Sequence, residues 1–313
     1  MNRIKKIGLI ILSSFVAISG LVVSLSIFSP QLIHRVIQKK TFYDLGLRTN
    51  TIHIENDYLE YVEGGKGPTV LLVHGFQAEK ASWTTYIKKL IGKYHVIAID
   101  LPGHGGSSLP ESLKFNLQSV ADHIEKFVHK LDLKKFHLVG SSMGGGLCAI
   151  YASKYPEHLL SLSLINPLGV GFDEKSEFFA LVDQGKNLFF PESIADLDEL
   201  SHYLTGRALK MGTFSKHCLL SYMTQKRPFY ERAFKDLWTS VPLDETLRKI
   251  QTRTLLIYGK QDRLLHPSSY KKYAENLPNP KVCELPKGTH VFTNEELDKS
   301  ITQLETFLEE SVR

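Results

Sequence analysis

From residue 51 onward, short runs of apolar residues alternate with longer stretches of helix-forming residues. Continuous apolar runs are typical of strands covered on both faces, and they occur at residues 69–73, 96–99, 136–139, 160–165, 254–258 and 282–285. Helical stretches separate most of them, at residues 83–91, 120–131, 143–154, 268–276 and 298–308. Residues 51–55 and 59–63 read as an antiparallel hairpin. The pattern predicts an α/β fold with a mainly parallel, eight-stranded sheet and helices on both faces.

The alternation stops between the apolar runs at 160–165 and 254–258. This interval of nearly ninety residues is far longer than one crossover connection needs. It is rich in helix formers and in aromatic residues, and we expect packing within the segment itself to account for more than half of these aromatic residues. We therefore predict a helical cap at residues 168–249, inserted into a core formed by residues 51–167 and 250–313.

The N-terminal residues 1–30 are predicted to form a membrane anchor. Ile7 to Phe28 is a run of 22 residues without a charge, and Arg3, Lys5 and Lys6 precede it. About 20 apolar residues suffice to cross a bilayer as a helix. A cleavable signal peptide, followed by secretion, is the competing interpretation, since the small residues Ala17 and Ser19 offer a possible cleavage site. The apolar stretch continues past them, which favours an uncleaved single-pass anchor.

Residues 31–50 are predicted to form a juxtamembrane helix or linker. Apolar residues recur there at helical spacing, with basic residues between them, as in a helix that lies on a membrane surface. A solvated linker helix is the alternative. Positive charges flank the anchor on both sides, so the orientation of the anchor in the membrane stays open.

The charge distribution argues against a nucleic-acid partner. The net charge of +5 arises in residues 1–50, which hold seven basic side chains and one acid, whereas residues 51–313 hold 31 basic and 32 acidic ones. This distribution favours anionic lipid headgroups. The three cysteines are widely spaced and no Cys/His metal spacing occurs, so we expect neither a disulfide framework nor a metal site.

A Gly-x-Ser-x-Gly motif is centred on Ser142, between the strand 136–139 and the helix 143–154. A tight turn of this type holds the serine in a strained conformation, and its glycines avoid a clash where strand and helix meet. The bare motif also fits a structural turn, but this placement favours a nucleophile. A dinucleotide-binding loop fits less well, because no Gly-x-Gly-x-x-Gly with a matching acid is present.

A serine nucleophile needs a base, and in this architecture the chain order is serine, acid, histidine. His290 follows the last predicted strand and lies at the carboxyl edge of the sheet, where catalytic groups gather. We predict that His290 is the base. His266 is the rival, but it lies four residues beyond Asp262 and shares its loop.

Asp262, in the loop after the strand 254–258, is the predicted acid that orients His290 and stabilises its protonated form. A solvated turn aspartate is the alternative. The other position used for the acid in this architecture holds Asn166, which is uncharged. Asp100 precedes Ser142 in the chain and is expected in a structural turn.

Acyl transfer also requires donors for the developing oxyanion. The backbone N–H of Met143 is one predicted donor. The backbone N–H of Phe76, in the loop after the strand 69–73, is the other. We expect His74 in the same loop to be a structural, hydrogen-bonded histidine.

Six segments then show a wider resemblance: His74-Gly-Phe with Trp83 downstream, Asp100-Leu-Pro-Gly-His-Gly, Gly140-Ser-Ser-Met-Gly-Gly, Asn166-Pro-Leu-Gly, Tyr258-Gly-Lys-Gln-Asp and Gly288-Thr-His. In them the chain resembles the monoacylglycerol lipases of the α/β-hydrolase superfamily, most closely the membrane-anchored type. The segments span residues 70–293. They specify the fold and the triad, whereas the cap, which decides the substrate, matches less well.

The resemblance implies hydrolysis of monoacylglycerols or similar lipid esters through an acyl-enzyme on Ser142, with no cofactor. A different reaction on the same three residues is an alternative: carbon–carbon bond hydrolysis, thioester hydrolysis or acyl transfer. A non-catalytic ligand-binding module is a further alternative, against which an intact set of Ser142, Asp262 and His290 argues.

Overall fold

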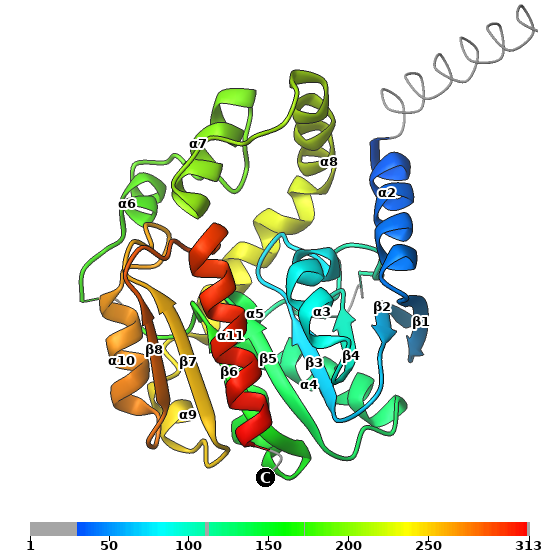
Figure 1. Ribbon diagram of the computed structural model, residues 1–313. Coiled ribbons are helices and arrows are strands. Elements are labelled where there is room, and N and C mark those ends of the chain that lie inside the picture. The colour runs from blue at the N-terminus through cyan, green and yellow to red at the C-terminus, as the bar shows by residue number, and fades with distance from the viewer. Residues whose placement is uncertain (1–29, 110–112, 172, 312–313) are drawn as a thin grey trace, which may run out of the picture.

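A mixed sheet forms the centre of the computed structural model, which describes residues 30–109, 113–171 and 173–311. Figure 1 shows its eight strands, in the order β1-β2-β4-β3-β5-β6-β7-β8. β2 pairs antiparallel with β1 and β4, and all other neighbours are parallel. The predicted fold class, a mainly parallel sheet of eight strands, is confirmed.

The secondary-structure elements follow the predicted alternation closely. The strands are β1 (Arg48–Ile54), β2 (Asp57–Gly64), β3 (Thr69–Val73), β4 (His95–Ile99), β5 (Phe136–Ser141), β6 (Leu159–Ile165), β7 (Thr254–Gly259) and β8 (Lys281–Leu285). The α-helices are α2 (Pro30–Asp44), α3 (Thr84–Leu90), α4 (Leu117–Lys130), α5 (Met143–Lys154), α6 (Glu177–Asp183), α7 (Ile194–Thr205), α8 (Thr213–Leu237), α9 (Asp244–Arg248), α10 (Ser268–Asn276) and α11 (Asn294–Glu310). The 3₁₀ turns are η1 (Lys80–Trp83), η2 (Pro156–His158) and η3 (Trp238–Ser240).

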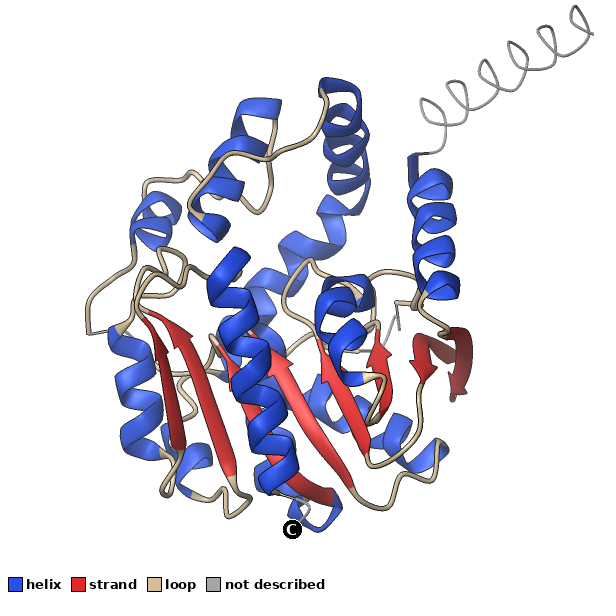
Figure 2. Cartoon of the chain, in the orientation of Figure 1, coloured by secondary structure: helices blue, strands red, loops and turns tan. Residues whose placement is uncertain are grey.

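Helices cover both faces of the sheet, as Figure 2 shows. Successive side chains of a strand point to opposite faces, and the central strands are mostly apolar, with a few buried polar residues such as His137 and Ser161. In β3, Val70 and Leu72 pack in the cluster that includes α3 and α11, whereas Leu71 and Val73 pack in the cluster that includes α4 and α5. The continuous apolar runs of the sequence therefore arise because these strands are buried on both sides.

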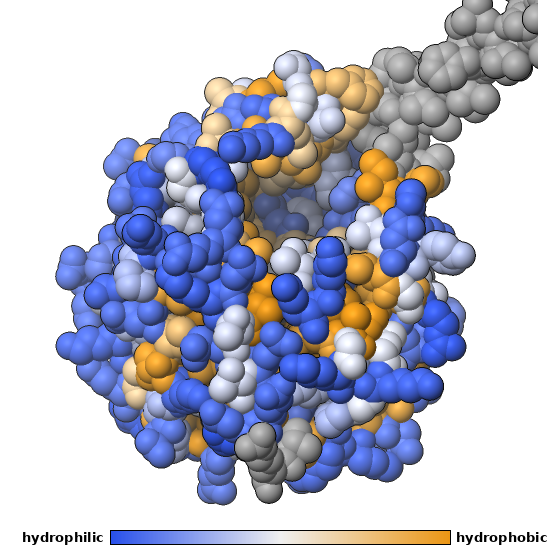
Figure 3. All heavy atoms as spheres, in the orientation of Figure 1, coloured by the Kyte–Doolittle hydropathy of each residue, from blue (hydrophilic) through white to orange (hydrophobic). Residues whose placement is uncertain are grey.

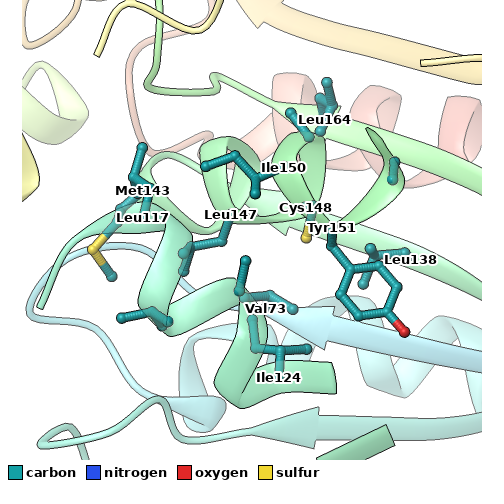
Figure 4. Close-up of a cluster of buried hydrophobic side chains, with 14 of the residues drawn as sticks. Val73, Leu117, Ile124, Leu138, Met143, Leu147, Cys148, Ile150, Tyr151 and Leu164 are labelled. Atoms are coloured by element: carbon teal, nitrogen blue, oxygen red, sulfur yellow. The ribbon is translucent and has the colours of Figure 1, made fainter. Parts of the chain in front are cut away.

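The most deeply buried helix is α5, which follows the turn at Ser142. Figure 4 shows Leu147, Cys148 and Tyr151 of α5 packed between the sheet and neighbouring helices. All residues from Met143 to Ala152 are buried. Burial on all sides explains the small residues at the start of α5, and it holds the turn at Ser142 rigidly against the sheet.

Between β6 and β7 the chain forms helices α6 to α9. Above the sheet, α6, α7 and α8 share a separate aromatic cluster with Phe178 and Phe189 at its centre. α9 falls within the predicted cap range, but it packs against α5 and α10, with Leu247 in the main core. The apolar residues Leu243 and Leu247 thus attach the end of the predicted cap range to the body.

The predicted anchor at residues 7–28 lies outside the described residues. Within the described part, no helix has the length and apolar character required to cross a membrane. α2 occupies most of the predicted juxtamembrane segment and packs against α8, and β1 begins at Arg48, inside that segment. In α2, Val36 is 58% exposed and Ile37 is 61% exposed.

One strand differs from its predicted environment. The apolar run at 282–285 was expected to be covered on both faces, but β8 is the edge strand of the sheet and most of its side chains are exposed. Val282 is 44% exposed. A short apolar run alone does not distinguish a central strand from an edge strand, because edge position depends on the order of pairing.

A buried ion group joins β2, β4 and η1. Asp100 follows β4, and its carboxylate accepts hydrogen bonds from the backbone N–H of Lys80 at 2.7 Å and that of Gly106 at 2.8 Å. The Lys80 ammonium donates to Asp100 at 2.5 Å and to Glu60 at 2.6 Å. Burial lowers the pKa of Lys80, but the two carboxylates outweigh it and raise that pKa. Asp100 therefore has the structural role that the sequence indicated.

Replacing Asp100 by asparagine should destabilise the fold, because the buried Lys80 ammonium would keep only the partly exposed Glu60 as a counter-charge. We expect the free energy of unfolding in urea to fall by about 3 kcal/mol. Asp132→Asn is the matched control, since the Asp132 side chain is 77% exposed, and it should change the value by less than about 0.5 kcal/mol. Equal free energies of unfolding for both variants would show that the ion group does not stabilise the fold.

Candidate active site

Ser142 lies at the tip of the turn between β5 and α5. Its φ of 55° lies in the left-handed region, where a non-glycine residue is strained. The flanking glycines permit this turn. A Cβ on Gly140 would lie 2.3 Å from the carbonyl oxygen of Gly144, and one on Gly144 would lie 2.3 Å from that of Val73. The motif therefore marks a true strand–turn–helix, with the serine side chain clear of the sheet.

The structure brings together the three predicted catalytic side chains. The Nε2 atom of His290 lies 3.0 Å from Oγ of Ser142, and its Nδ1 atom lies 2.7 Å from Oδ2 of Asp262. His290 is 5% exposed and Asp262 is 4% exposed. The rival base, His266, contacts Ser268 and the carboxylate of Glu174 instead. Serine, imidazole and carboxylate thus form one continuous hydrogen-bonded chain.

Asp262 is held by donors on both of its oxygens. Oδ1 accepts hydrogen bonds from the backbone N–H groups of Leu264 and Leu265, at 2.8 Å and 2.9 Å. Oδ2 accepts from Nδ1 of His290 and also from the hydroxyl of Tyr270. The carboxylate is therefore fixed in orientation by hydrogen bonds on both oxygens.

Asn166 occupies the alternative acid position and joins the strands that carry the other groups. Its Oδ1 atom accepts from the N–H of Gly259 at 2.9 Å. Its Nδ2 group donates to the carbonyl oxygens of Thr289 and His290, at 3.1 Å and 2.8 Å. The buried amide thus ties the end of β6 to the end of β7 and to the backbone of the His290 loop.

The two predicted oxyanion donors, Met143 and Phe76, flank Ser142. Met143 begins α5 directly after Ser142. The loop with Phe76 passes close by, because a Cβ on Gly75 would lie only 3.0 Å from Cβ of Ser142. Among the backbone hydrogen bonds of residues 30–109, 113–171 and 173–311, neither of the two N–H groups has a partner. They are available to an oxygen bound beside the serine.

His74 has the structural role expected for it. Its Nε2 atom accepts from the N–H of Leu101 at 3.0 Å, and Nδ1 lies 2.8 Å from the carbonyl oxygen of Gly75, to which it donates. These partners assign the neutral tautomer. Complete burial lowers the pKa of His74, which agrees with a neutral ring. His74 therefore fixes the loop that carries Phe76.

Ser142 and His290 border a cavity of about 790 Å³. Figure 3 shows the hollow in the surface, with hydrophobic side chains around it. The inner wall is mainly apolar and comes from the cap and the loops below it: Phe76, Phe189, Leu200, Met223, Tyr230 and Leu264. A cavity of this size suits a ligand of several hundred daltons, and its wall suits an apolar chain.

The outer part of the cavity is formed by α2 and by the start of α8. His34 and Ile37 of α2 line it, as do Met211, just before α8, and Phe214, in its first turn. Met211 and Phe214 are 41% and 49% exposed. Helix α2 thus forms a wall of the cavity, and the rim of the cavity carries exposed apolar side chains.

α2 is fixed to the loop that follows Phe76. The carboxylate of Glu79 accepts from Nε2 of His34 at 2.5 Å, and the amide of Gln38 donates to the same oxygen. The hydrogen bond to Glu79 raises the pKa of His34. The helix after the predicted anchor and the predicted oxyanion loop are therefore in direct contact.

No group of three or more His, Cys, Asp and Glu side chains in residues 30–109, 113–171 and 173–311 is arranged to hold a metal ion. Cys148 is buried, Cys218 and Cys283 are partly buried, and none of the three forms a disulfide. The functional groups at the site are a serine hydroxyl, a base, an acid and two backbone N–H donors.

Comparison with known proteins gives the family. The model of the alpha/beta hydrolase fold family matches residues 68–296. The chain belongs to this family. Monoacylglycerol lipase ABHD6 of Rattus norvegicus is 28% identical and covers 84% of the chain and 83% of its own length. The Xenopus laevis protein named monoacylglycerol lipase abhd6-B is 30% identical, with 78% and 76% covered.

Solved structures agree with this family. A membrane phospholipase A has a TM-score of 0.86 and 30% identity, and the match covers 98% of this chain and 99% of the other. A dienoate hydrolase from Rhodococcus, with a TM-score of 0.73 and 20% identity over 84% of this chain and 99% of its own, shows the likeness of fold alone. The family predicted from the sequence motifs is confirmed.

Three features of the site were not found from the sequence. Tyr270 contacts Asp262, Asn166 binds the His290 loop, and α2 lines the cavity. The Asn166-Pro-Leu-Gly segment was a detectable signal for the second. The other two depend on contacts between segments far apart in the chain.

Proposed function

We propose that the chain is a serine hydrolase that cleaves carboxylic esters of lipids, with monoacylglycerols as its principal substrates. The observation that carries this proposal is the hydrogen-bonded chain from Oγ of Ser142 through His290 to Asp262. Membership of the alpha/beta hydrolase family and the similarity to proteins named monoacylglycerol lipase support it.

The proposed reaction begins when Nε2 of His290 takes the Ser142 hydroxyl proton and Oγ attacks the ester carbonyl carbon. The N–H groups of Met143 and Phe76 stabilise the negative charge on the carbonyl oxygen. The imidazolium then gives its proton to the leaving alcohol as the ester bond breaks. A water molecule, deprotonated by His290, releases the fatty acid from Ser142.

Asp262 supports both halves of this reaction. Its Oδ2 atom accepts from Nδ1, which leaves Nε2 free to receive the serine proton. Its charge stabilises the imidazolium that forms. The steps use only side chains and backbone amides of the chain together with water.

The cavity supports a lipid as the substrate. Its apolar inner wall would hold an acyl chain, because burying apolar surface contributes about 25 cal/mol per Å². Polar groups border the cavity beside α2, where His34 contacts Glu79. A fatty acyl chain in the inner part and a small polar alcohol in the outer part would match this arrangement.

A phospholipid is the second candidate substrate. It is favoured by one observation, the similarity over nearly the whole chain to a structure named as a membrane phospholipase A. Both substrates present a carboxylic ester on an acyl chain, so the same triad chemistry serves both. The size and charge of the headgroup distinguish them.

We further propose that the chain is held at a membrane by residues 7–28, with α2 at the lipid surface. α2 begins at Pro30, directly after this segment. It exposes Val36 and Ile37 beside basic residues, Arg35 and Lys39, which suits the boundary between acyl chains and anionic headgroups. Ile37 of α2 lines the cavity and is also exposed, so a lipid would enter the cavity from the bilayer on this side.

Labelling with a fluorophosphonate tests the nucleophile and its base. The wild-type chain should react, Ser142→Ala should not react at all, and His290→Ala should react only weakly, because the base is lost. His266→Ala is the control and should label like the wild type. Asp262→Asn should lower kcat by about 10⁴-fold, as in other triads. Undiminished labelling of Ser142→Ala would refute the proposal.

Substrate assays test the lipid class. We expect purified chain to release glycerol from monoacylglycerols faster than it releases fatty acid from phospholipids, since the polar groups of the outer cavity suit a small uncharged alcohol. Thioester and dienone substrates should react more slowly still. Ser142→Ala provides the background rate. Faster turnover of a dienone or thioester would replace the proposed activity with that of a carbon–carbon hydrolase or a thioesterase.

Quenching by brominated lipids tests the membrane-facing rim. In full-length chain reconstituted into vesicles with brominated acyl chains, we expect the added fluorescence of Phe214→Trp to be quenched. Val282→Trp is the control, because Val282 is similarly exposed, at 44% against 49%, but lies on β8 away from the cavity. Fluorescence of the wild type gives the contribution of the two native tryptophans. Equal quenching of the two variants would rule out this rim as the lipid-facing surface.

A further inference from the structure

Tyr270 is a buried side chain that touches the triad and has no place in the mechanism described above. It lies on α10, and its hydroxyl donates a hydrogen bond to Oδ2 of Asp262. The same oxygen accepts from Nδ1 of His290 at 2.7 Å. Two donors therefore compete for the charge on one carboxylate oxygen, the oxygen that orients the imidazole.

The position of the Tyr270 hydroxyl is tightly fixed. The side chain is fully buried, and its ring stacks on that of Tyr258 with centroids 5.1 Å apart and planes 26° apart. Tyr258 is itself hydrogen-bonded to Glu284 on the edge strand β8. Burial, and then the neighbouring Asp262, raise the pKa of Tyr270 well above its usual range, so its hydroxyl keeps its proton and remains a donor.

We propose that Tyr270 is a positioning residue of the active site, which fixes the Asp262 carboxylate and sets how much of its charge acts on His290. This inference rests on the proposed function of the triad. The backbone N–H groups of Leu264 and Leu265 hold the other carboxylate oxygen. Together with the hydroxyl of Tyr270, these N–H groups hold the carboxylate so that it presents one acceptor oxygen to His290 in a fixed orientation.

The hydrogen bond from Tyr270 has a definite effect on the imidazole. A donor on Oδ2 spreads the negative charge and weakens its attraction for the imidazolium. Without that donor, the carboxylate would bind the imidazolium more strongly, and His290 would stay protonated, and inactive as a base, to a higher pH. The carboxylate would also lose one of the donors that hold it in position, which would lower kcat.

Few other groups affect how strongly the Asp262 carboxylate attracts the imidazolium of His290. The partners of the pair are the backbone N–H groups of Leu264 and Leu265, the hydroxyl of Ser142 and the hydroxyl of Tyr270. The uncharged amide of Asn166, at the end of β6, donates to the backbone carbonyl oxygen of His290. In the described part of the chain, Asp262 is the only charged side chain in an ion pair or hydrogen bond with His290. A change in the pH profile is therefore attributable to the Asp262 oxygen.

The test compares Tyr270→Phe with Tyr273→Phe in the full chain. Tyr273 is the matched control, because it is equally buried on the same helix but donates its hydroxyl to the carbonyl oxygen of Leu168. The measurement is kcat and KM for a lipid ester across pH. We expect Tyr270→Phe to lower kcat about tenfold, the size for one hydrogen bond to a charged group, with KM unchanged. The acid limb of its pH profile should move to higher pH.

In the control, Tyr273→Phe, the acid limb of the pH profile should stay at the wild-type pH, even if this variant is less stable. An acid limb at the wild-type pH in Tyr270→Phe would overturn the proposal. The same shift in both variants would also overturn it, because loss of packing would then be the cause. Wild-type chain that does not hydrolyse esters or label at Ser142 would instead refute the proposed function.

A second variant preserves the tyrosine ring and hydroxyl in case Tyr270→Phe fails to fold. Site-specific 3-fluorotyrosine at position 270 is a stronger donor, so the acid limb should move to lower pH. The Nδ1–H proton of His290 gives an NMR signal that needs no turnover. This signal should move upfield with the stronger donor and downfield in Tyr270→Phe. Signals that do not move in either variant would overturn the proposal.

Discussion

The strained backbone of Ser142 is the constraint on which the site depends. A φ of 55° at a serine persists only where its surroundings enforce it. Here the Ser142 N–H donates to the carbonyl oxygen of Ile165, and the Ser142 carbonyl oxygen accepts from Gly145 and Leu168. β6 and the segment after it therefore hold the turn from one side, while the buried helix α5 holds it from the other.

The same hydrogen bonds connect the nucleophile to the base and the acid. Asn166 follows Ile165 directly, and its side chain binds the N–H of Gly259 and the carbonyl oxygen of His290. The ends of β5, β6 and β7 are thus joined by short links between adjacent parallel strands. Because each link is buried, a movement of one catalytic group would cost hydrogen bonds at the others. Oγ of Ser142 and Nε2 of His290 are held 3.0 Å apart by this network.

Much of this arrangement was predictable because it is local in the chain. A buried strand, two close glycines and a small-residue helix identify Ser142, and chain order then selects Asp262 and His290. Tyr270 was not predictable, because nothing distinguishes its position on α10 from that of Tyr273 until the helix is packed. The exposure of β8 was missed because apolar content does not encode strand order. The place of α2 beside the cavity depends on its contact with α8, which no local pattern specifies.

The contact between α2 and the oxyanion loop links the two ends of the proposed function. Glu79 is three residues after Phe76, and it receives hydrogen bonds from His34 and Gln38 of α2. Glu79 raises the pKa of His34, so this contact stabilises the fold fully below the ordinary pKa of histidine. That stabilisation is lost as the pH rises through the raised value. A helix that follows the proposed anchor therefore supports the loop expected to bind the oxyanion. The same few side chains thus link the proposed position of the chain at a lipid surface to the geometry of its active site.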